Sequence, residues 1–432
     1  MSTLTSVIQL VVVLSALIIL HEIGHYLGAR LFKLDVEEFG IGIPPQLLRY
    51  WRGKGSLTIG DTRVKIPAGT QVLQDLEEGN WVEAITTRDK SGGQVLRELK
   101  VLNPNSQDLT SGQSLSESGD IRLRGTVSAL KLGMLFTLNW LPLGGFVKIK
   151  GEGDTSVPDG LACANPWKRL VVYAFGPLMN LALGVIFYTV IANQLGAADL
   201  SRVMVVGIAP NSPAEAAGLQ VGDLIESIDQ TAVESVNSLQ EEIYARLGSQ
   251  VELSLNRADQ VQVVMLVPRE NPPEGEGAIG ILLGNPSIPI PWYTALPRGA
   301  QMTFNHALVL LTLPAQVVKG AIAPEDARVV GYKGMYDIYQ NVQERELVPG
   351  APQSLNTLVF LATITISLGI LNLLPIPALD GGRILFALPE IIIRRRIPIQ
   401  VQNLVNMVSF TLMIVLFIYI NILDFTNPIQ LP

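Results

Sequence analysis

The stretch that decides the fold is residues 5–32, TSVIQLVVVLSALIILHEIGHYLGARLF. As an α-helix, which rises 1.5 Å per residue, it is long enough to cross the roughly 30 Å hydrocarbon layer of a membrane. It has no basic segment before it and no cleavage site within it, so we expect a retained span and not a cleavable signal peptide. Two His and one Glu inside such a helix are costly in lipid and indicate a functional site.

The rest of the chain supports a membrane protein. Charged residues make up only 16% of it, hydrophobic residues 48%, and the mean hydropathy is +0.35. Three further spans are predicted, at about 170–198, 354–374 and 396–424. A fifth apolar stretch, 300–322, includes Asn305, His306, Pro314 and Lys319, so it favours an interfacial or amphipathic helix.

Basic residues near the ends of the spans predict the orientation of the chain, because Lys and Arg favour the cytoplasmic side. They lie after the first span, before the second and before the fourth: Arg30, Lys33, Lys168, Arg169, Arg394, Arg395 and Arg396. We therefore expect 33–166 and 378–400 on the cytoplasmic side. The N-terminus, 199–353 and the C-terminus should then be extracytoplasmic.

The pentapeptide HEIGH at 21–25 carries the chemistry. The single Cys163 excludes both an intramolecular disulfide and a thiolate metal site, which leaves imidazoles and carboxylates as ligands. His21 and His25 lie one helical turn apart on one face, a spacing suited to a single Zn²⁺. Glu22 is placed to take a proton from a water that zinc activates. The alternatives are a polar contact between helices or a proton relay in a transporter.

A catalytic zinc site needs a third protein ligand and an open position. His306 is one candidate, but it lies in the interfacial stretch on the far side of the membrane. Asp380 is the better one, because two spans separate it from the first helix and return it to the same membrane face. Its alternative is an ordinary Asp-Gly turn at a helix end.

The segments between the spans differ in character. Residues 201–268 are predicted to form a compact domain of short strands and a helix, and 271–298 a linker. The polar residues 61–126 fit a small β-rich insertion or a partly disordered loop equally well. The net charge of −7 gives no sign of a nucleic-acid surface, so no nucleic-acid partner is expected.

Five motifs in order resemble the site-2 protease family, and within it the bacterial regulator-of-sigma-E type. They are HEIGH, LPLGGFVKIKGE at 141–152, FGPLMN at 175–180, GLQVGDLI at 218–225 and NLLPIPALDGG at 372–382. Only one clear signature of a PDZ domain is found, where that type commonly has two. The insertion at 61–126 also separates the first helix from 141–152 by more than the family pattern expects. Both departures bear on substrate selection and not on catalysis.

The resemblance implies roles for individual residues. His21, His25 and Asp380 would bind zinc, and Glu22 would activate water. Four more residues would contact the substrate: Asn372, Asn180, Gly144 and Gly145. The alternative for each Asn is a hydrogen bond between helices. The run 141–152 would be a membrane-associated β-hairpin with a close turn at its two glycines, whose edge receives the unwound substrate as an added strand; the alternative is a simple surface hairpin.

The expected fold is a membrane protein of four transmembrane α-helices with a membrane-associated β-hairpin and an extracytoplasmic α+β PDZ-like domain. The expected segments are helix 1 (1–32), a cytoplasmic segment with the insertion (33–128), the hairpin region (129–166), helix 2 (167–198), the PDZ-like domain (199–270), a linker with the interfacial helix (271–353), helix 3 (354–378), a cytoplasmic loop (379–400) and helix 4 (401–424).

The expected function is a zinc endopeptidase that cuts within or near transmembrane segments, close to the cytoplasmic face of a bacterial inner or plasma membrane. By resemblance, its substrates would be single-span anti-sigma factors or remnant signal peptides, trimmed first by an upstream site-1-type protease. The PDZ-like domain would exclude bulky substrates or bind peptides. The alternatives are a non-catalytic PDZ-bearing scaffold or chaperone, whose signature would be a missing ligand or base, and a metal transporter, whose signature would be an internal repeat.

Overall fold

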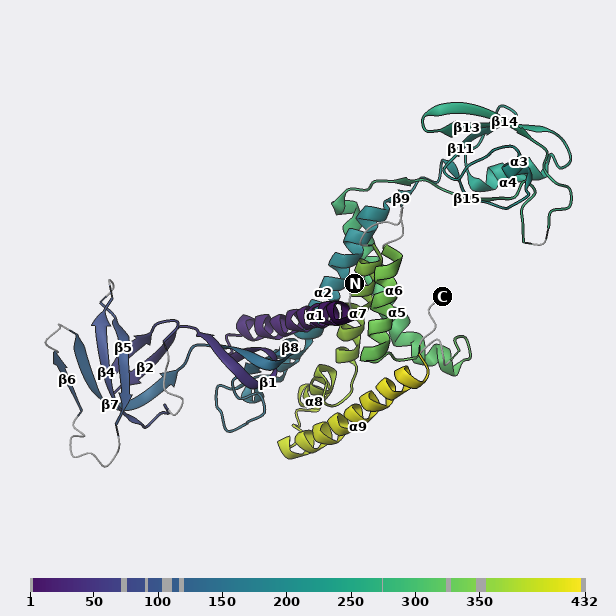
Figure 1. Ribbon diagram of the computed structural model, residues 1–432. Coiled ribbons are helices and arrows are strands. Elements are labelled where there is room, and N and C mark those ends of the chain that lie inside the picture. The colour runs from purple at the N-terminus through teal and green to yellow at the C-terminus, as the bar shows by residue number, and fades with distance from the viewer. Residues whose placement is uncertain are drawn as a thin grey trace. The chain divides into compact units, whose positions relative to one another are not determined.

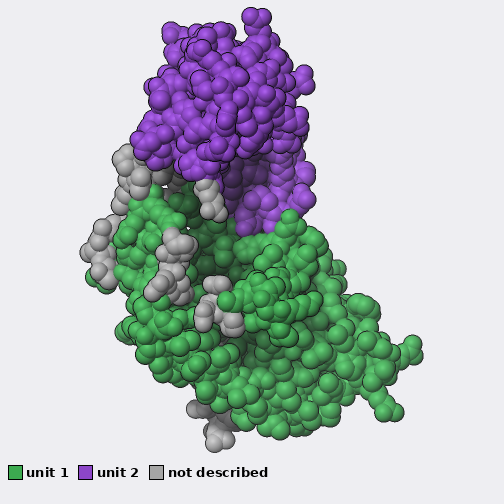
Figure 2. Space-filling view, turned by 90° about the vertical axis from the view of Figure 1, so that its right-hand side faces the viewer, with its two compact units in different colours: residues 1–184, 303–432 green, residues 185–302 purple. Residues whose placement is uncertain are grey.

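The computed structural model describes residues 3–70, 76–89, 92–102, 111–115, 120–273, 275–323, 328–346 and 355–428. The chain divides into two compact units, residues 1–184 with 303–432 and residues 185–302 (Figure 2). The boundaries between the units fall inside two helices, α2 (Pro166–Leu195) and α5 (Trp292–Val318). Each unit is described by itself.

Four helices of the described residues are long and apolar enough to cross a membrane. They are α1 (Thr3–Leu31), α2, α7 (Leu355–Leu373) and α9 (Ile399–Thr426). The shortest has 19 residues, or about 28 Å of helix, which still matches the hydrocarbon layer. The prediction of four membrane-spanning helices is thus confirmed at the level of length and composition. Helix α5 is long but does not meet the same criteria, and its interfacial position stays a prediction.

Strands β1 (Val36–Arg52) and β8 (Leu135–Ile149) are antiparallel, and both are bent so that each contributes two segments to one small sheet. Residues 36–41 lie between 135–138 and 145–149, and residues 46–52 pair with 135–139. Among the described residues, the segment 145–149 therefore has a strand on one side only. Helix α1 runs beside this sheet (Figure 1).

The expected hairpin within 141–152 is wrong in its pairing. Gly145 pairs with Ile41, so the partner strand precedes the insertion and Gly144–Gly145 is not the turn of a local hairpin. Gly144 has a φ of +73° and donates its N–H to Ser15 Oγ at 3.2 Å. A Cβ on Gly144 would lie 2.9 Å from Ile18 Cγ2. The glycines let β8 pass close to α1, because a side chain would collide there.

The insertion between β1 and β8 is a small β-barrel. Its strands are β2 (Gly55–Ile59), β3 (Thr62–Ile66), β4 (Trp81–Arg88), β5 (Gln94–Val101), β6 (Gly112–Leu115) and β7 (Ile121–Lys131). They pair in the order β2-β3-β5-β4-β7-β6, and β7 also pairs with β2, which closes five of them into a ring. Alternating inward residues such as Leu57, Val64 and Val82 are fully buried. Of the two alternatives for 61–126, the described residues therefore form the β-rich one.

The barrel is joined to the sheet of β1 and β8 through a narrow neck between Gly53 and Gly133. Gly53 donates its N–H to the carbonyl of Met134 at 2.8 Å. A Cβ on Gly133 would lie only 2.1 Å from Gly53 O. Because neither glycine carries a side chain, the outgoing and returning chains lie directly against each other.

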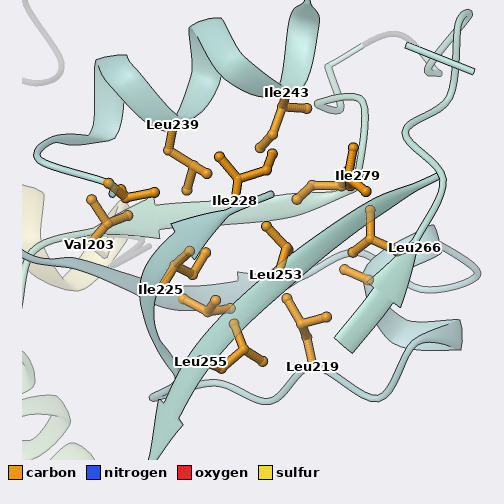
Figure 3. Close-up of a cluster of buried hydrophobic side chains, with 14 of the residues drawn as sticks. Val203, Leu219, Ile225, Ile228, Leu239, Ile243, Leu253, Leu255, Leu266 and Ile279 are labelled. Carbon is orange, nitrogen blue, oxygen red and sulfur yellow. The ribbon is translucent and has the colours of Figure 1, made fainter. Parts of the chain in front are cut away.

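Unit 2 is a small α+β domain. Its main sheet has the order β14-β13-β11-β10-β15, from β10 (Val203–Ile208), β11 (Leu224–Ile228), β13 (Val251–Arg257), β14 (Gln260–Leu266) and β15 (Ile281–Gly284). Shorter elements are β9 (Ala197–Ala198), α3 (Pro213–Ala216), β12 (Thr231–Ala232) and β16 (Ser287–Ile288). Helix α4 (Val236–Tyr244) points Leu239 and Ile243 at Ile228 and Leu253 of the sheet (Figure 3).

Helix α4 begins at a capping box. Ser235 Oγ accepts the N–H of Ser238, and Ser238 Oγ accepts the N–H of Ser235, which satisfies donors that the first helical turn leaves open. The buried carboxylate of Asp223, directly before β11, accepts two hydrogen bonds from Arg257 at the end of β13, both at 2.7 Å. The core and this ion pair give unit 2 an interior of its own.

The chain between α7 and α9 returns to α1. Pro375 and Pro377 follow the end of α7, and α8 (Asp380–Ile393) starts at once. Cβ atoms on Gly381 and Gly382 would lie 2.0 Å from Leu374 O and 2.5 Å from Ile376 O, so only glycine lets the first turn of α8 fold against this segment. A helix was not expected in 379–400. The remaining elements of unit 1 are the short η1 (Leu161–Cys163) and α6 (Tyr332–Glu346).

Candidate metal centre

Helices α1 and α2 are in close backbone contact beside HEIGH. A Cβ on Gly24 would lie 2.3 Å from Phe175 O, and a Cβ on Gly28 would lie 3.1 Å from Val172 Cα. A Cβ on Gly176 would lie 2.4 Å from His25 Nε2 and 2.8 Å from His21 Nε2. Small residues at this crossing allow close backbone contact between helices in lipid. They also keep the space in front of both imidazoles free of side chains.

Asp380, the first residue of α8, completes a group of three ligand atoms. Its Oδ2 lies 3.0 Å from His21 Nε2 and 3.2 Å from His25 Nε2, and the two Nε2 atoms are 3.2 Å apart. Ligands about 2.0–2.1 Å from a tetrahedral zinc would be about 3.3–3.4 Å from one another. All three residues are buried. The residues present therefore fit a zinc ion, which His21, His25 and Asp380 would hold.

The outer nitrogen of each imidazole also has a neighbour. His25 Nδ1 lies 2.9 Å from the carbonyl oxygen of Val172, an acceptor that fixes the proton on Nδ1 and leaves Nε2 free for a metal. His21 Nδ1 lies 3.2 Å from Nδ2 of the Asn180 side chain. A ring position set by such outer contacts is typical of metal-binding histidines.

Glu22 is held by the edge segment of β8. Its Oε2 accepts the N–H of Val147 at 3.0 Å. On its other side, the segment 145–149 pairs with β1. The N–H of Val147 therefore points away from β1 and toward α1. The carboxylate therefore lies between the imidazoles and the exposed edge of the strand.

A cavity of about 410 Å³ opens over these groups. It is lined by Ile18, His21, Glu22, His25, Phe146, Val147, Ile149, Glu152, Tyr173, Asn180, Leu368, Asn372, Ala378, Leu379, Asp380 and Arg383. A second, more polar cavity of about 540 Å³ shares Ile149, Glu152, Tyr173 and Arg383 with it. At the shared wall, Arg383 forms an ion pair with Glu152 and lies over the ring of Tyr173 at 5.5 Å. The Arg383 side chain thus lies in the wall that the two cavities share.

Charge near Arg383 opposes the effect of its burial. Burial alone would lower the pKa of Arg383, but the negative charges of Glu152 and Asp380 raise it. The guanidinium is therefore a fixed positive charge one turn after Asp380. Neither partner of the Arg383–Glu152 pair was among the residues predicted to form the site. Their positions in the sequence could have pointed to them, because Glu152 ends the motif LPLGGFVKIKGE and Arg383 directly follows NLLPIPALDGG.

The structure brings some of the predicted site residues together and not others. His21, Glu22, His25, Asn180, Asn372 and Asp380 all line one cavity. Gly144 and Gly145 do not line it and pack against Ile18 and Ile19 of α1. His306 lies on α5, outside the group of three, and burial lowers its pKa. The backbone N–H of Val147, which donates to Glu22, was not predicted, because a side-chain pattern does not reveal a backbone donor.

Two histidines, one carboxylate as the third ligand and an adjacent glutamate inside a bundle of apolar helices define a metallopeptidase that is an integral membrane protein. Comparison with known families agrees, since peptidase family M50 matches residues 9–60 and 124–416. The chain belongs to peptidase family M50. The predicted resemblance to site-2 proteases is confirmed, the chain is a metalloendopeptidase, and zinc is its cofactor.

Individual relatives span almost the whole chain. A Clostridium perfringens protein that carries the provisional name zinc metalloprotease is 27% identical over 417 residues, 96% of this chain and 97% of the relative. The regulator of sigma-W protease RasP of Bacillus subtilis is 24% identical over 395 residues, 90% of each chain. Among solved structures, the PDZ domain of an SdrC-like protein from Listeria monocytogenes is 25% identical and covers 20% of this chain and 92% of its own, with a TM-score of 0.18.

Proposed function

We propose that the protein is an intramembrane zinc endopeptidase that hydrolyses peptide bonds within or near transmembrane segments of other membrane proteins. The observation that carries this proposal is the group His21, His25 and Asp380, whose ligand atoms lie 3.0–3.2 Å apart on and beside a helix apolar enough to span the membrane. Glu22 lies next to the group. A scaffold that had lost catalysis would lack a ligand or the base, and both are present.

When bound, zinc supplies a Lewis acid for the substrate carbonyl and lowers the pKa of a bound water to about 7. Glu22 takes a proton from the attacking water. The water oxygen bonds to the carbonyl carbon, the C–N bond breaks, and Glu22 returns the proton to the departing amine nitrogen. The Val147 N–H orients the Glu22 carboxylate before and during these transfers.

The substrate must be extended before its amide can reach the centre, because a helix buries its own backbone groups. The segment 145–149 has one free edge beside the cavity, so an unwound substrate can add to it as a strand. Asn372, partly exposed in the cavity wall, is placed to hydrogen-bond a freed substrate amide that lipid cannot satisfy. Gly144 and Gly145 would act indirectly, by keeping this edge close to α1.

The polar cavity beyond Arg383 suits the hydrophilic chain that follows a transmembrane segment. The substrate class is accordingly a single-span protein cut close to the cytoplasmic face. A relative named regulator of sigma-W protease favours a substrate that controls a sigma factor, as an anti-sigma factor does, and remnant signal peptides are the second substrate class proposed. An upstream site-1-type protease would act first, and the PDZ-like unit 2 would admit only trimmed substrates.

The proposed orientation follows the basic residues and agrees with the order of the helices. Asp380 reaches the histidines of α1 after the spans α2 and α7, as a centre at one membrane face requires. The barrel and α8 would then be cytoplasmic, and unit 2 extracytoplasmic, in a bacterial inner or plasma membrane. Cysteine labelling of intact cells at positions in the barrel and in unit 2 tests this orientation.

The test of the chemistry separates metal binding from catalysis. Glu22→Gln should keep zinc but abolish cleavage of a model transmembrane substrate by the purified full chain. Glu98→Gln, at an exposed position on the barrel, is the matched control and should cleave normally. Asp380→Ala should lower the zinc content. Full activity of Glu22→Gln would refute the role of the base, and unchanged zinc in Asp380→Ala would remove Asp380 from the ligands.

A further inference from the structure

The side chain of Asn180 is buried next to the metal centre with one of its two polar atoms lacking a hydrogen bond among the described residues. It is fully buried on α2, and its Nδ2 lies 3.2 Å from His21 Nδ1. Its Oδ1 is also buried and has no hydrogen-bond partner among the described residues. A buried polar atom without a partner costs free energy and calls for a physical explanation. The explanation lies in the proton of His21.

A histidine that binds zinc through Nε2 must carry its proton on Nδ1. With Nδ2 of Asn180 opposite, two N–H groups would then face each other. A half-turn of the amide about its Cβ–Cγ bond exchanges Oδ1 and Nδ2, which occupy nearly equivalent positions. Oδ1 then accepts the proton on His21 Nδ1, and the unpartnered oxygen gains its hydrogen bond.

From this geometry we infer that Asn180 is a positioning residue for the zinc ligand His21, and that it acts by accepting the Nδ1–H of the imidazole. The inference rests on the proposed zinc chemistry. It differs from the substrate contact predicted for Asn180 from the sequence. Full burial favours the positioning role, because a substrate amide needs a group that it can reach, as it can the partly exposed Asn372.

The surroundings hold Asn180 in place for this role. Thr365 of α7, itself buried, donates its hydroxyl to the backbone carbonyl of Asn180 at 3.2 Å. Gly369, one turn further along α7, packs against the carbonyl of Pro177. Helix α7 therefore fixes the turn of α2 that carries Asn180. In this arrangement each imidazole has its own outer acceptor: Val172 O for His25 and Asn180 Oδ1 for His21.

The experiment measures zinc affinity of the purified full-length protein by competition with a fluorescent chelator. Loss of an outer partner of a metal-binding histidine typically weakens metal binding by about 10–100-fold, and we expect a loss of this size for Asn180→Leu. Asn180→Asp keeps the acceptor and loses the donor, so its affinity should equal or exceed that of the unaltered protein. Asn372→Leu is the control, and it should raise KM without changing zinc affinity.

Asn180→Asp keeps the inference testable if the leucine variant fails to fold, since the two side chains have nearly the same shape. Unchanged zinc affinity in a folded Asn180→Leu protein, or a loss in Asn180→Asp, would overturn the inference. If the unaltered protein binds zinc and cleaves while these outcomes are seen, only the role of Asn180 fails. If the unaltered protein itself does not bind zinc, the proposed function fails as well.

Discussion

Replacing Gly176 by alanine is the sharpest perturbation that the metal centre offers. The added Cβ would lie 2.4 Å from His25 Nε2 and 2.8 Å from His21 Nε2, where 3.4 Å is an ordinary contact. The shortfalls are therefore about 1.0 Å and 0.6 Å. Metal–ligand distances tolerate only about 0.2 Å. Both imidazoles must move several times further than that, and we expect zinc affinity to fall at least about 100-fold, or about 2.8 kcal/mol.

The assay is zinc content after dialysis against a weak chelator, followed by cleavage of a model transmembrane substrate. Gly184→Ala is the control on the same helix. Its Cβ would meet the side chain of Ile366 at 2.5 Å, so it should disturb packing while zinc content stays the same. One tightly bound zinc per chain in Gly176→Ala would refute the argument that the helix crossing shapes the metal site.

Three more predictions concern other parts of the molecule. Val147→Pro removes the N–H that holds Glu22, and position 147 lies at a strand edge where proline is tolerated. Turnover should therefore fall at least about tenfold while zinc is retained, and the control Val147→Ala should stay active. Zinc loss in the proline variant would contradict this. Burial alone would raise the pKa of Asp223, but hydrogen bonds from Arg257 lower it. The pKa of Asp223 in the folded protein lies below its unfolded value of about 3.9, so the ion pair stabilises unit 2 above pH 4 and this stabilisation is lost as the pH falls further. Hydrogen exchange in unit 2 should detect the loss, and the Asp223→Asn variant should not show this pH dependence. Leu57→Ala should destabilise the barrel by about 2–5 kcal/mol, seen as faster hydrogen exchange in β4 and β7, while cleavage of a minimal substrate persists.

The parts of the fold that sequence predicts well are those with local signals. A span is one uninterrupted apolar run, and HEIGH sets its ligands one turn apart on a single helix. Asp380 could be placed with them because counting spans fixes the membrane face to which each loop returns. These inferences need no knowledge of which distant segments pair.

The parts that sequence could not predict depend on distant partners. The run 141–149 has the composition of a strand, but nothing in it shows that its partner is 36–41, beyond a whole inserted barrel. The barrel is built from short strands separated by polar turns, a pattern equally compatible with a disordered loop. The role of Asn180 depends on which of its two amide atoms faces His21, and sequence does not specify it.

The neck between Gly53 and Gly133 makes the barrel a removable module. The family match covers residues 9–60 and 124–416 and leaves 61–123, most of the barrel, unmatched. Since the two strands meet where the barrel begins, a two-residue turn could replace residues 54–132 at little cost in loop-closure entropy. The same site should accept another domain whose ends lie close together. An engineer could therefore insert a sensor domain at this site, directly before β8, the strand whose segment 145–149 borders the metal-binding cavity.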